Sequence, residues 1–231
     1  MKTRSKRYIA IQDKIEDRTY AVEEAITTLQ SIANARFTES VDANVSLNID
    51  PKYADQQLRA TLILPEGTGQ TKRIAALVEE DQFEQAKNAG ADIVGSTDLI
   101  DDITKGVLDF EILITTPKLM PKLAKLGKVL GPKGLMPSPK TGTITTNLDE
   151  TIEEFKRGKI EYRADKHGNV HINFGKIDFS ADSLTTNLKA VFDSLEKNRP
   201  SGVKGKYMKR FTVSTTMSPA IELNLETLKQ V

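Results

Sequence analysis

The chain has 231 residues, of which 38% are hydrophobic and 28% charged, and its 33 basic and 32 acidic side chains give a formal net charge of +1. This composition excludes an intrinsically disordered chain and is typical of a globular protein. The absence of cysteine excludes disulfides and thiolate chemistry, and no window approaches the roughly 18 apolar residues of a membrane span. The basic start of the chain is not followed by a long apolar run, so we expect a protein that is neither secreted nor membrane-spanning.

The first third of the chain predicts a helix followed by strands of an antiparallel sheet. Apolar side chains recur at helical spacing over residues 20–33. Residues 37–49 then alternate between apolar and polar side chains, and residues 58–64 repeat this alternation. Because an antiparallel sheet often has one buried and one solvated face, we expect the apolar set to point inward. In the first strand this set is Phe37, Val41, Ala43, Val45, Leu47 and Ile49.

The middle of the chain has short apolar runs between helical segments. The apolar runs cover residues 74–78, 91–94 and 110–115, and the helical patterns cover 80–89, 97–108 and 149–156. Strands that are apolar on both faces and alternate with helices predict a parallel sheet of βαβ type. Another helix is expected at Thr116 and Pro117, since proline favours the first helical position. It would carry lysines on one face and leucines nearly opposite: Lys118, Lys122 and Lys125 against Leu119, Leu123 and Leu126.

The stretch "LGKVLGPKGLMPSPKTGT", residues 126–143, is too rich in glycine and proline to predict a helix or a plain strand. Its glycines expose backbone N–H groups, and its prolines hold the path extended and stiff. Lys128, Lys133 and Lys140 supply charges for phosphates. An ordered basic loop of this kind suits nucleic-acid contact, and the alternative is a rigid surface loop kept soluble by lysine.

The last third of the chain returns to the pattern of the first third. Strands are predicted at residues 159–164, 169–174 and 207–217, the last with Tyr207, Phe211, Val213 and Met217 inward. Between them a helix is predicted that begins at Asp182 or Ser183 and ends at Asn198. The fold class is therefore mixed α/β and α+β. A discontinuous α+β domain of residues 1–67 and 159–231, with an antiparallel sheet and helices, would hold an inserted three-layer α/β domain of βαβ type at residues 68–158. The glycine-containing crossings "PEGTG" and "KRGK" would permit hinge motion.

The near-neutral total hides a strong segregation of charge along the chain. Ten acids lie between residues 79 and 111, whereas residues 112–148 contain six lysines and no acid. A second basic run without acids covers residues 197–221, and a third opens the chain with Lys2, Arg4, Lys6 and Arg7. One such run is often only a solvated face, but three in one chain favour phosphate binding.

Few residues suggest catalysis. His167 and His171 are the only histidines, and no third zinc ligand accompanies them. The βαβ middle lacks the glycine fingerprints of dinucleotide and phosphate loops, so we expect no cofactor, no metal and no catalytic residue. Two alternatives to specific RNA binding stay open at this point. One is a nucleotide-dependent enzyme built on the βαβ segment, and the other is a general nucleic-acid-binding protein whose affinity follows charge alone.

The chain resembles the ribosomal protein L-one family over essentially its whole length. The resemblance is carried by the inserted-domain layout and by three motifs: "LGKVLGPKGLMPSPKTGT", "STTMSPAIELN" and "RFTESV". The resemblance implies a non-enzymatic structural constituent of the large ribosomal subunit that binds the rRNA of the mobile stalk. It also implies assistance in the release of deacylated tRNA from the exit site and translational repression of the protein's own mRNA. The location implied is the ribosome in a bacterial cytoplasm or a plastid stroma.

The resemblance also implies which residues touch RNA. The rRNA-binding set would be Arg36, Phe37, Glu39, Ser40, Thr216, Met217, Ser218 and Pro219. Arg36 would pair with phosphate, Phe37 would either stack on a base or pack in the core, and Glu39 would accept from a 2′-OH or a base N–H. The family commonly has glycine where this chain has Ser218. The serine would either weaken the RNA contact or add a hydrogen bond to it. A tRNA-facing basic surface would consist of Lys118, Lys122, Lys125, Lys128, Lys133 and Lys140.

Overall fold

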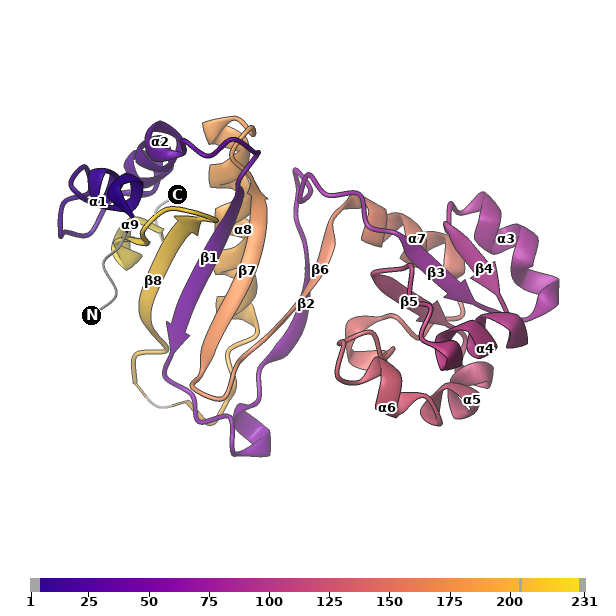
Figure 1. The fold of residues 1–231 in the computed structure, drawn as a ribbon. Helices are drawn as coiled ribbons and strands as arrows, with labels where there is room; N and C mark the ends of the chain where they lie inside the picture. The colour runs from indigo at the N-terminus through magenta and orange to yellow at the C-terminus, as the bar shows by residue number, and fades with distance from the viewer. Residues whose placement is uncertain (1–4, 204, 229–231) are drawn as a thin grey trace. The chain divides into compact units, whose positions relative to one another are not determined.

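The structure, a computed structural model, describes residues 5–203 and 205–228 (Figure 1). Lys2, Arg4 and Lys204, which belong to the basic runs noted above, lie outside the described residues. The chain divides into two units, Met1–Gly69 with Ile160–Val231 and Gln70–Lys159. We call the first the antiparallel unit and the second the inserted unit. No helix among the described residues combines the length and apolar character needed to cross a bilayer.

The antiparallel unit is built on a four-stranded sheet with helices on one face. The strand order is β7 (Asn169–Lys176), β1 (Ser40–Leu47), β8 (Met208–Thr215) and β9 (Ile221–Glu222), with every neighbour antiparallel. Alternate residues of β1, from Val41 to Leu47, are buried in one core with the apolar faces of α2 (Val22–Ile32) and α8 (Ala181–Lys197). The polar side chains between them therefore form the opposite, helix-free face. The predicted antiparallel sheet is confirmed.

Smaller elements complete this unit. Strands β2 (Arg59–Ile63) and β6 (Lys159–Arg163) pair with each other, and the 3-10 turn η1 (Ala54–Gln56) lies in the connection from β1 to β2. Helix α1 (Lys6–Gln12), strand β9 and helix α9 (Leu225–Leu228) were not predicted, because each is too short for its period to stand out.

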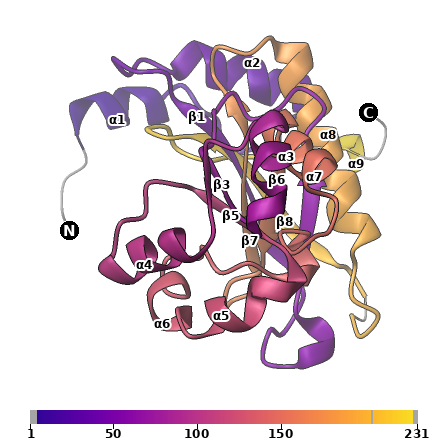
Figure 2. The same ribbon diagram turned by 90° about the vertical axis from the view of Figure 1, so that its right-hand side faces the viewer.

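The inserted unit has a parallel sheet of order β4 (Ile93–Gly95), β3 (Ile74–Leu77) and β5 (Ile112–Thr115), covered on both faces. Ile74 and Ala76 of β3 pack with α3 (Phe83–Asn88) and α7 (Leu148–Arg157), whereas Ala75 and Leu77 pack with the opposite helices. Figure 2 shows α3 and α7 on one side and α4 (Thr97–Lys105), α5 (Met120–Ala124) and α6 (Gly127–Leu130) on the other. The predicted three-layer βαβ arrangement is confirmed. Two 3-10 turns, η2 (Glu80–Gln82) and η3 (Pro117–Leu119), precede α3 and α5.

Several local predictions were wrong. Strand β1 begins at Ser40 rather than at residue 37, so Phe37 lies outside the strand and is 54% exposed instead of pointing inward. Strand β8 ends at Thr215, and Met217 is 43% exposed in the turn beyond it. Helix α8 is capped by Ser180, whose hydroxyl accepts from Ser183 N at 3.1 Å, and not by Asp182 or Ser183.

The stretch 126–143 contains a helical turn, α6, where no helix was expected. Its Leu130 is completely buried against Leu123 and Leu126, so tertiary burial outweighs the low helix propensity of the flanking glycines. A second turn, η4 (Pro139–Thr141), ends at Gly142, which adopts the left-handed conformation with φ 71°. The loop is therefore a folded segment and not an extended one.

Candidate nucleic-acid interface

Two segments far apart in the sequence meet at one end of the antiparallel sheet. Backbone pairing continues past the strand ends, since Thr216 N donates to Ser40 O at 3.1 Å. The hydroxyl oxygen of Thr216 accepts from Ser40 N, also at 3.1 Å. In Figure 1 this is the end at which β1 begins and β8 finishes. Residues 36–40 and 216–219, predicted as one site, are thus adjacent. We call this end the tip surface.

Glu39 holds the tip surface together from inside. Its side chain is 2% exposed, and its Oε2 accepts from the hydroxyl of Thr215 at 2.6 Å and from Met217 N at 2.9 Å. Its other oxygen, Oε1, accepts from Ala35 N at 3.2 Å. The carboxylate therefore fixes both segments of the tip surface and faces the protein, unlike the outward acceptor expected from the sequence.

The outer layer of the tip surface combines apolar, hydroxyl and cationic groups. Phe37 and Met217 are exposed to 54% and 43%, in a protein whose other apolar side chains are mostly buried. Arg36 and Thr216 are also exposed. A hollow of about 460 Å³ lies in this surface, and Arg36, Phe37, Ile177 and Asp178 are among the residues that line it. An exposed ring next to a guanidinium can stack on a base while the charge meets a phosphate.

Ser218 is accommodated without backbone strain. No residue other than glycine has a positive φ among the described residues, so Ser218 does not occupy a conformation that requires glycine. Its hydroxyl accepts from Thr215 N at 2.9 Å and donates to Pro219 O at 2.9 Å. The side chain thus closes the turn that presents Met217.

Replacing Ser218 tests this role. Because Ser218→Ala removes the acceptor for Thr215 N, we expect the free energy of unfolding to fall by about 1 kcal/mol. Denaturant unfolding of both proteins measures the difference. Ser214→Ala removes a hydroxyl that accepts from a side chain, Asn44 Nδ2 at 3.3 Å, and serves as the control. An equal loss in both variants would contradict a special role for the backbone bond of Ser218.

The polar face of the sheet forms a second hollow of about 490 Å³, lined by Thr216 and Ser218 of the tip surface and by strand residues that the sequence did not assign to function. Its side chains bond across strands: Asn173 Nδ2 donates to Asp42 Oδ1 at 2.9 Å, and Asn44 Oδ1 lies 2.7 Å from His171 Nδ1. Asn173 Oδ1 has no hydrogen-bond partner within the structure. The alternation of residues 37–49 indicated this wet face, but only the strand register shows which polar side chains are neighbours.

The six lysines predicted to face tRNA are all exposed on the inserted unit. Lys118 forms an ion pair with Glu79 at 2.9 Å, and this hydrogen bond raises the pKa of Lys118. The other five have no ion-pair partner in the part of the chain that the structure describes. Opposite them, Leu119, Leu123 and Leu126 are buried, as the helical pattern predicted.

Hydrogen bonds at its base hold the lysine-bearing loop in place. Thr115 N, in β5, donates to Thr143 O at 2.9 Å, and Thr145 N donates to Thr115 O at 3.0 Å. Within the loop, the hydroxyl of Thr143 accepts from Ser138 N at 2.9 Å. Lys128, Lys133 and Lys140 are therefore presented from a supported frame.

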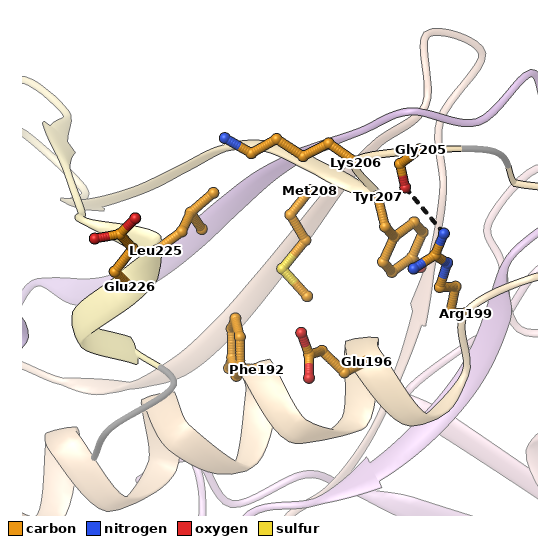
Figure 3. A pocket seen from close by; sticks show the side chains of 9 residues that line it. All are labelled: Phe192, Glu196, Arg199, Gly205, Lys206, Tyr207, Met208, Leu225 and Glu226. Carbon is orange, nitrogen blue, oxygen red and sulfur yellow. Dashed lines mark hydrogen bonds between the residues drawn. The ribbon is translucent and has the colours of Figure 1, made fainter.

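A third hollow, of about 450 Å³, lies between α8, the start of β8 and α9 and contains none of the predicted residues (Figure 3). Its floor includes Phe192, Met208 and Leu225. Arg199 lies 5.7 Å from the centroid of the Tyr207 ring and donates to Gly205 O at 3.0 Å. Burial raises the pKa of Tyr207 to about 12, which keeps its hydroxyl neutral. Figure 3 shows this arginine bonded to Gly205, in the segment before β8.

The fold defines a class of α/β protein in which a parallel-sheet unit interrupts the chain of an antiparallel-sheet unit. The model of the Ribosomal protein L1p/L10e family matches residues 29–219, and the chain belongs to this family of structural, non-enzymatic ribosomal proteins. It is 57% identical over 221 residues to the large ribosomal subunit protein uL1c of Guillardia theta, covering 96% of this chain and 94% of that protein. It is 52% identical over 229 residues to the large ribosomal subunit protein uL1 of Prochlorococcus marinus (strain MIT 9515), covering 99% and 97%. The relatives are thus of plastid and bacterial type.

Proposed function

We propose that this structural protein of the large ribosomal subunit binds the rRNA of the mobile stalk through the tip surface. The observation that supports this most is the pair of exposed apolar side chains, Phe37 and Met217, held on two strand ends by one buried carboxylate. Exposed apolar groups beside a cation suit unstacked bases and the shallow groove of RNA. The eight predicted residues form this surface, with Glu39 supporting it from inside.

The inserted unit has a separate role in this proposal. Its exposed lysines, from η3 through α5 and α6 to Lys140, attract the phosphates of tRNA leaving the exit site. Assistance in the release of deacylated tRNA is the function we assign to this basic surface. The protein would also repress translation of its own mRNA if that mRNA folds like the stalk rRNA and binds to the same tip surface.

The division of the chain into the discontinuous domain 1–67 and 159–231 and the inserted domain 68–158 is part of the same proposal. The two units have separate cores, because the residues of one apolar cluster all come from the antiparallel unit and those of the other two from the inserted unit. Each domain would therefore keep its own fold while it contacts a different RNA.

Substitutions in the tip surface test the rRNA assignment. Thr216→Val removes the hydroxyl and Met217→Ala removes the exposed apolar contact, so each should weaken stalk-rRNA binding by roughly 1–3 kcal/mol. Titration of a labelled stalk-rRNA fragment with each purified protein measures this loss. An unchanged affinity would remove the residue from the site.

The double variant Lys122→Ala/Lys125→Ala is the matched comparison on the other unit. It removes two positive charges, yet it should leave stalk-rRNA affinity nearly intact because these lysines are assigned to tRNA. Equal losses from the tip and lysine variants would contradict the division of roles between the two units.

A further inference from the structure

Three loops meet at the end of the antiparallel sheet opposite the tip surface, where β1 ends and β7 and β8 begin (Figure 1). Leu47 N donates to Gly168 O at 3.0 Å, and Asn48 N donates to Tyr207 O at 2.7 Å. Ala164 N donates to Leu58 O at 3.0 Å. Residues 48–58, the end of β6 with residues 164–168, and residues 202, 203 and 205–207 are therefore neighbours, although they are far apart in the sequence.

An exposed aromatic ring and three exposed cations lie at this end of the sheet: Tyr53 and Lys52 in the first loop, Arg163 at the end of β6, and Lys166 in the second loop. Tyr53 is 60% exposed, a larger exposed fraction than that of Phe37 in the tip surface. Lys52, Arg163 and Lys166 are exposed, and none has an ion-pair partner in the part of the chain that the structure describes. We call these four residues the far-end surface. None belongs to the predicted RNA-binding set.

Two of the acids of these loops, Asp50 and Asp165, accept hydrogen bonds from the backbone and form no ion pair with the cations. Asp50 Oδ1 accepts from Lys52 N at 3.2 Å, and Asp165 Oδ1 accepts from His167 N and Asn169 N, both at 2.8 Å. These hydrogen bonds lower the pKa of Asp165. Asp55, the third acid, is exposed beside Gly202. The carboxylates of Asp50 and Asp165 thus support the loop shapes, and they do not pair with Lys52, Arg163 or Lys166.

We propose that the far-end surface is a second RNA contact, at which an unpaired base stacks on Tyr53 and phosphates lie against Lys52, Arg163 and Lys166. The inference rests on the proposed rRNA-binding function and extends it. Strand β1 has eight residues, so the two surfaces are separated by about 27 Å along the sheet. A single RNA that reaches both would follow the sheet, whose helix-free face carries the polar side chains of β1.

Variants of the far-end surface test the proposal in the full-length protein with a stalk-rRNA fragment as the probe. Tyr53→Ala should weaken binding about tenfold, within the range of a lost base–aromatic stack, and Tyr53→Phe should bind within about twofold of wild type. Lys52→Ala/Lys166→Ala should reduce the slope of log affinity against log salt by about 1.4 to 1.8, because each phosphate contact contributes about 0.7 to 0.9. The control Lys87→Ala/Lys156→Ala removes the same charge from exposed helix positions of the inserted unit.

The outcomes separate this inference from the function on which it rests. If wild type prefers stalk rRNA to a scrambled hairpin but the Tyr53 and double-lysine variants match it at every salt concentration, the far-end contact is wrong and the tip assignment stands. If wild type shows no preference, the proposed function fails and the second contact fails with it. Unchanged RNA binding combined with poor incorporation of Tyr53→Ala into large subunits would identify a protein contact and overturn the RNA proposal. Lys52, Tyr53 and Lys166 are exposed outside the helices and strands, and circular dichroism checks that every variant retains the fold.

Discussion

The variant Glu39→Ala is expected to bind stalk rRNA at least tenfold more weakly than wild type, although it removes a negative charge from an RNA-binding protein. Electrostatics alone predicts the opposite, because losing an acid strengthens attraction to a polyanion. The structure predicts a loss because Met217 N, Ala35 N and the hydroxyl of Thr215 would lose their acceptor. Since a buried polar group left unpaired costs about 1–3 kcal/mol, we also expect the free energy of unfolding to fall by about 3 kcal/mol.

Two further variants show whether the effect comes from the hydrogen bonds. Glu39→Gln keeps one acceptor oxygen and should fall between wild type and Glu39→Ala in both affinity and stability. Glu23→Ala removes an exposed carboxylate from the same unit and should change neither by much. Affinity is measured by titration with the stalk fragment, and stability by denaturant unfolding. Tighter RNA binding by Glu39→Ala would show that its charge matters more than its support of the tip surface.

The second large effect is expected at Asn187, which is fully buried in helix α8. Its amide nitrogen donates to Phe174 O at 2.9 Å and to Gly67 O at 3.0 Å, and its oxygen accepts from Glu66 N at 3.0 Å. This one side chain ties the segment before the crossing at Gly69 to the core of the antiparallel unit. Asn187→Leu should therefore lower the free energy of unfolding by about 3 kcal/mol, since it leaves buried polar groups unpaired.

The same variant should leave the tip surface intact. Hydrogen exchange should show faster exchange at the amide of Glu66, while the amide of Met217 stays protected and stalk-rRNA affinity under native conditions stays close to wild type. Thr186→Ala, on the exposed side of the same helix, should change stability by no more than about 0.5 kcal/mol. If Asn187→Leu lost no more stability than Thr186→Ala, the role of the Asn187 hydrogen bonds in holding the segment before Gly69 would be contradicted.

The two sheets and the helices that cover them were predicted well from the sequence, because the hydrophobic patterns of these elements are strong and local. The alternation in residues 40–47 and the fully apolar residues 74–77 identified an antiparallel and a parallel sheet, and both are present. Burial of Leu119, Leu123 and Leu126 opposite the lysines followed from helical spacing. The short elements α1, β9 and α9 escaped prediction because a few residues do not establish a period.

The site residues were predicted by resemblance, but their arrangement was not. The period-two alternation predicted that Phe37 and Met217 point inward. The strands end at Ser40 and Thr215, and both side chains are exposed in the segments beyond these ends. Glu39 breaks the apolar alternation of its strand, but a local pattern does not identify the partner of its carboxylate, Thr215, which lies 176 residues away. The cross-strand neighbours on the polar face, such as Asn44 and His171, likewise depend on register.

The central claim is that geometry, and not charge alone, selects the stalk rRNA. A salt series of binding affinities for the full-length protein, with a stalk-rRNA fragment and with a scrambled hairpin of equal length, tests it most directly. We expect both affinities to fall with salt, by about 0.7 to 0.9 in log slope per phosphate neutralised, while a large gap between the two RNAs persists. If the affinities for the two RNAs are equal and both are lost as salt rises, the claim is contradicted, and only nonspecific contacts from the basic runs remain.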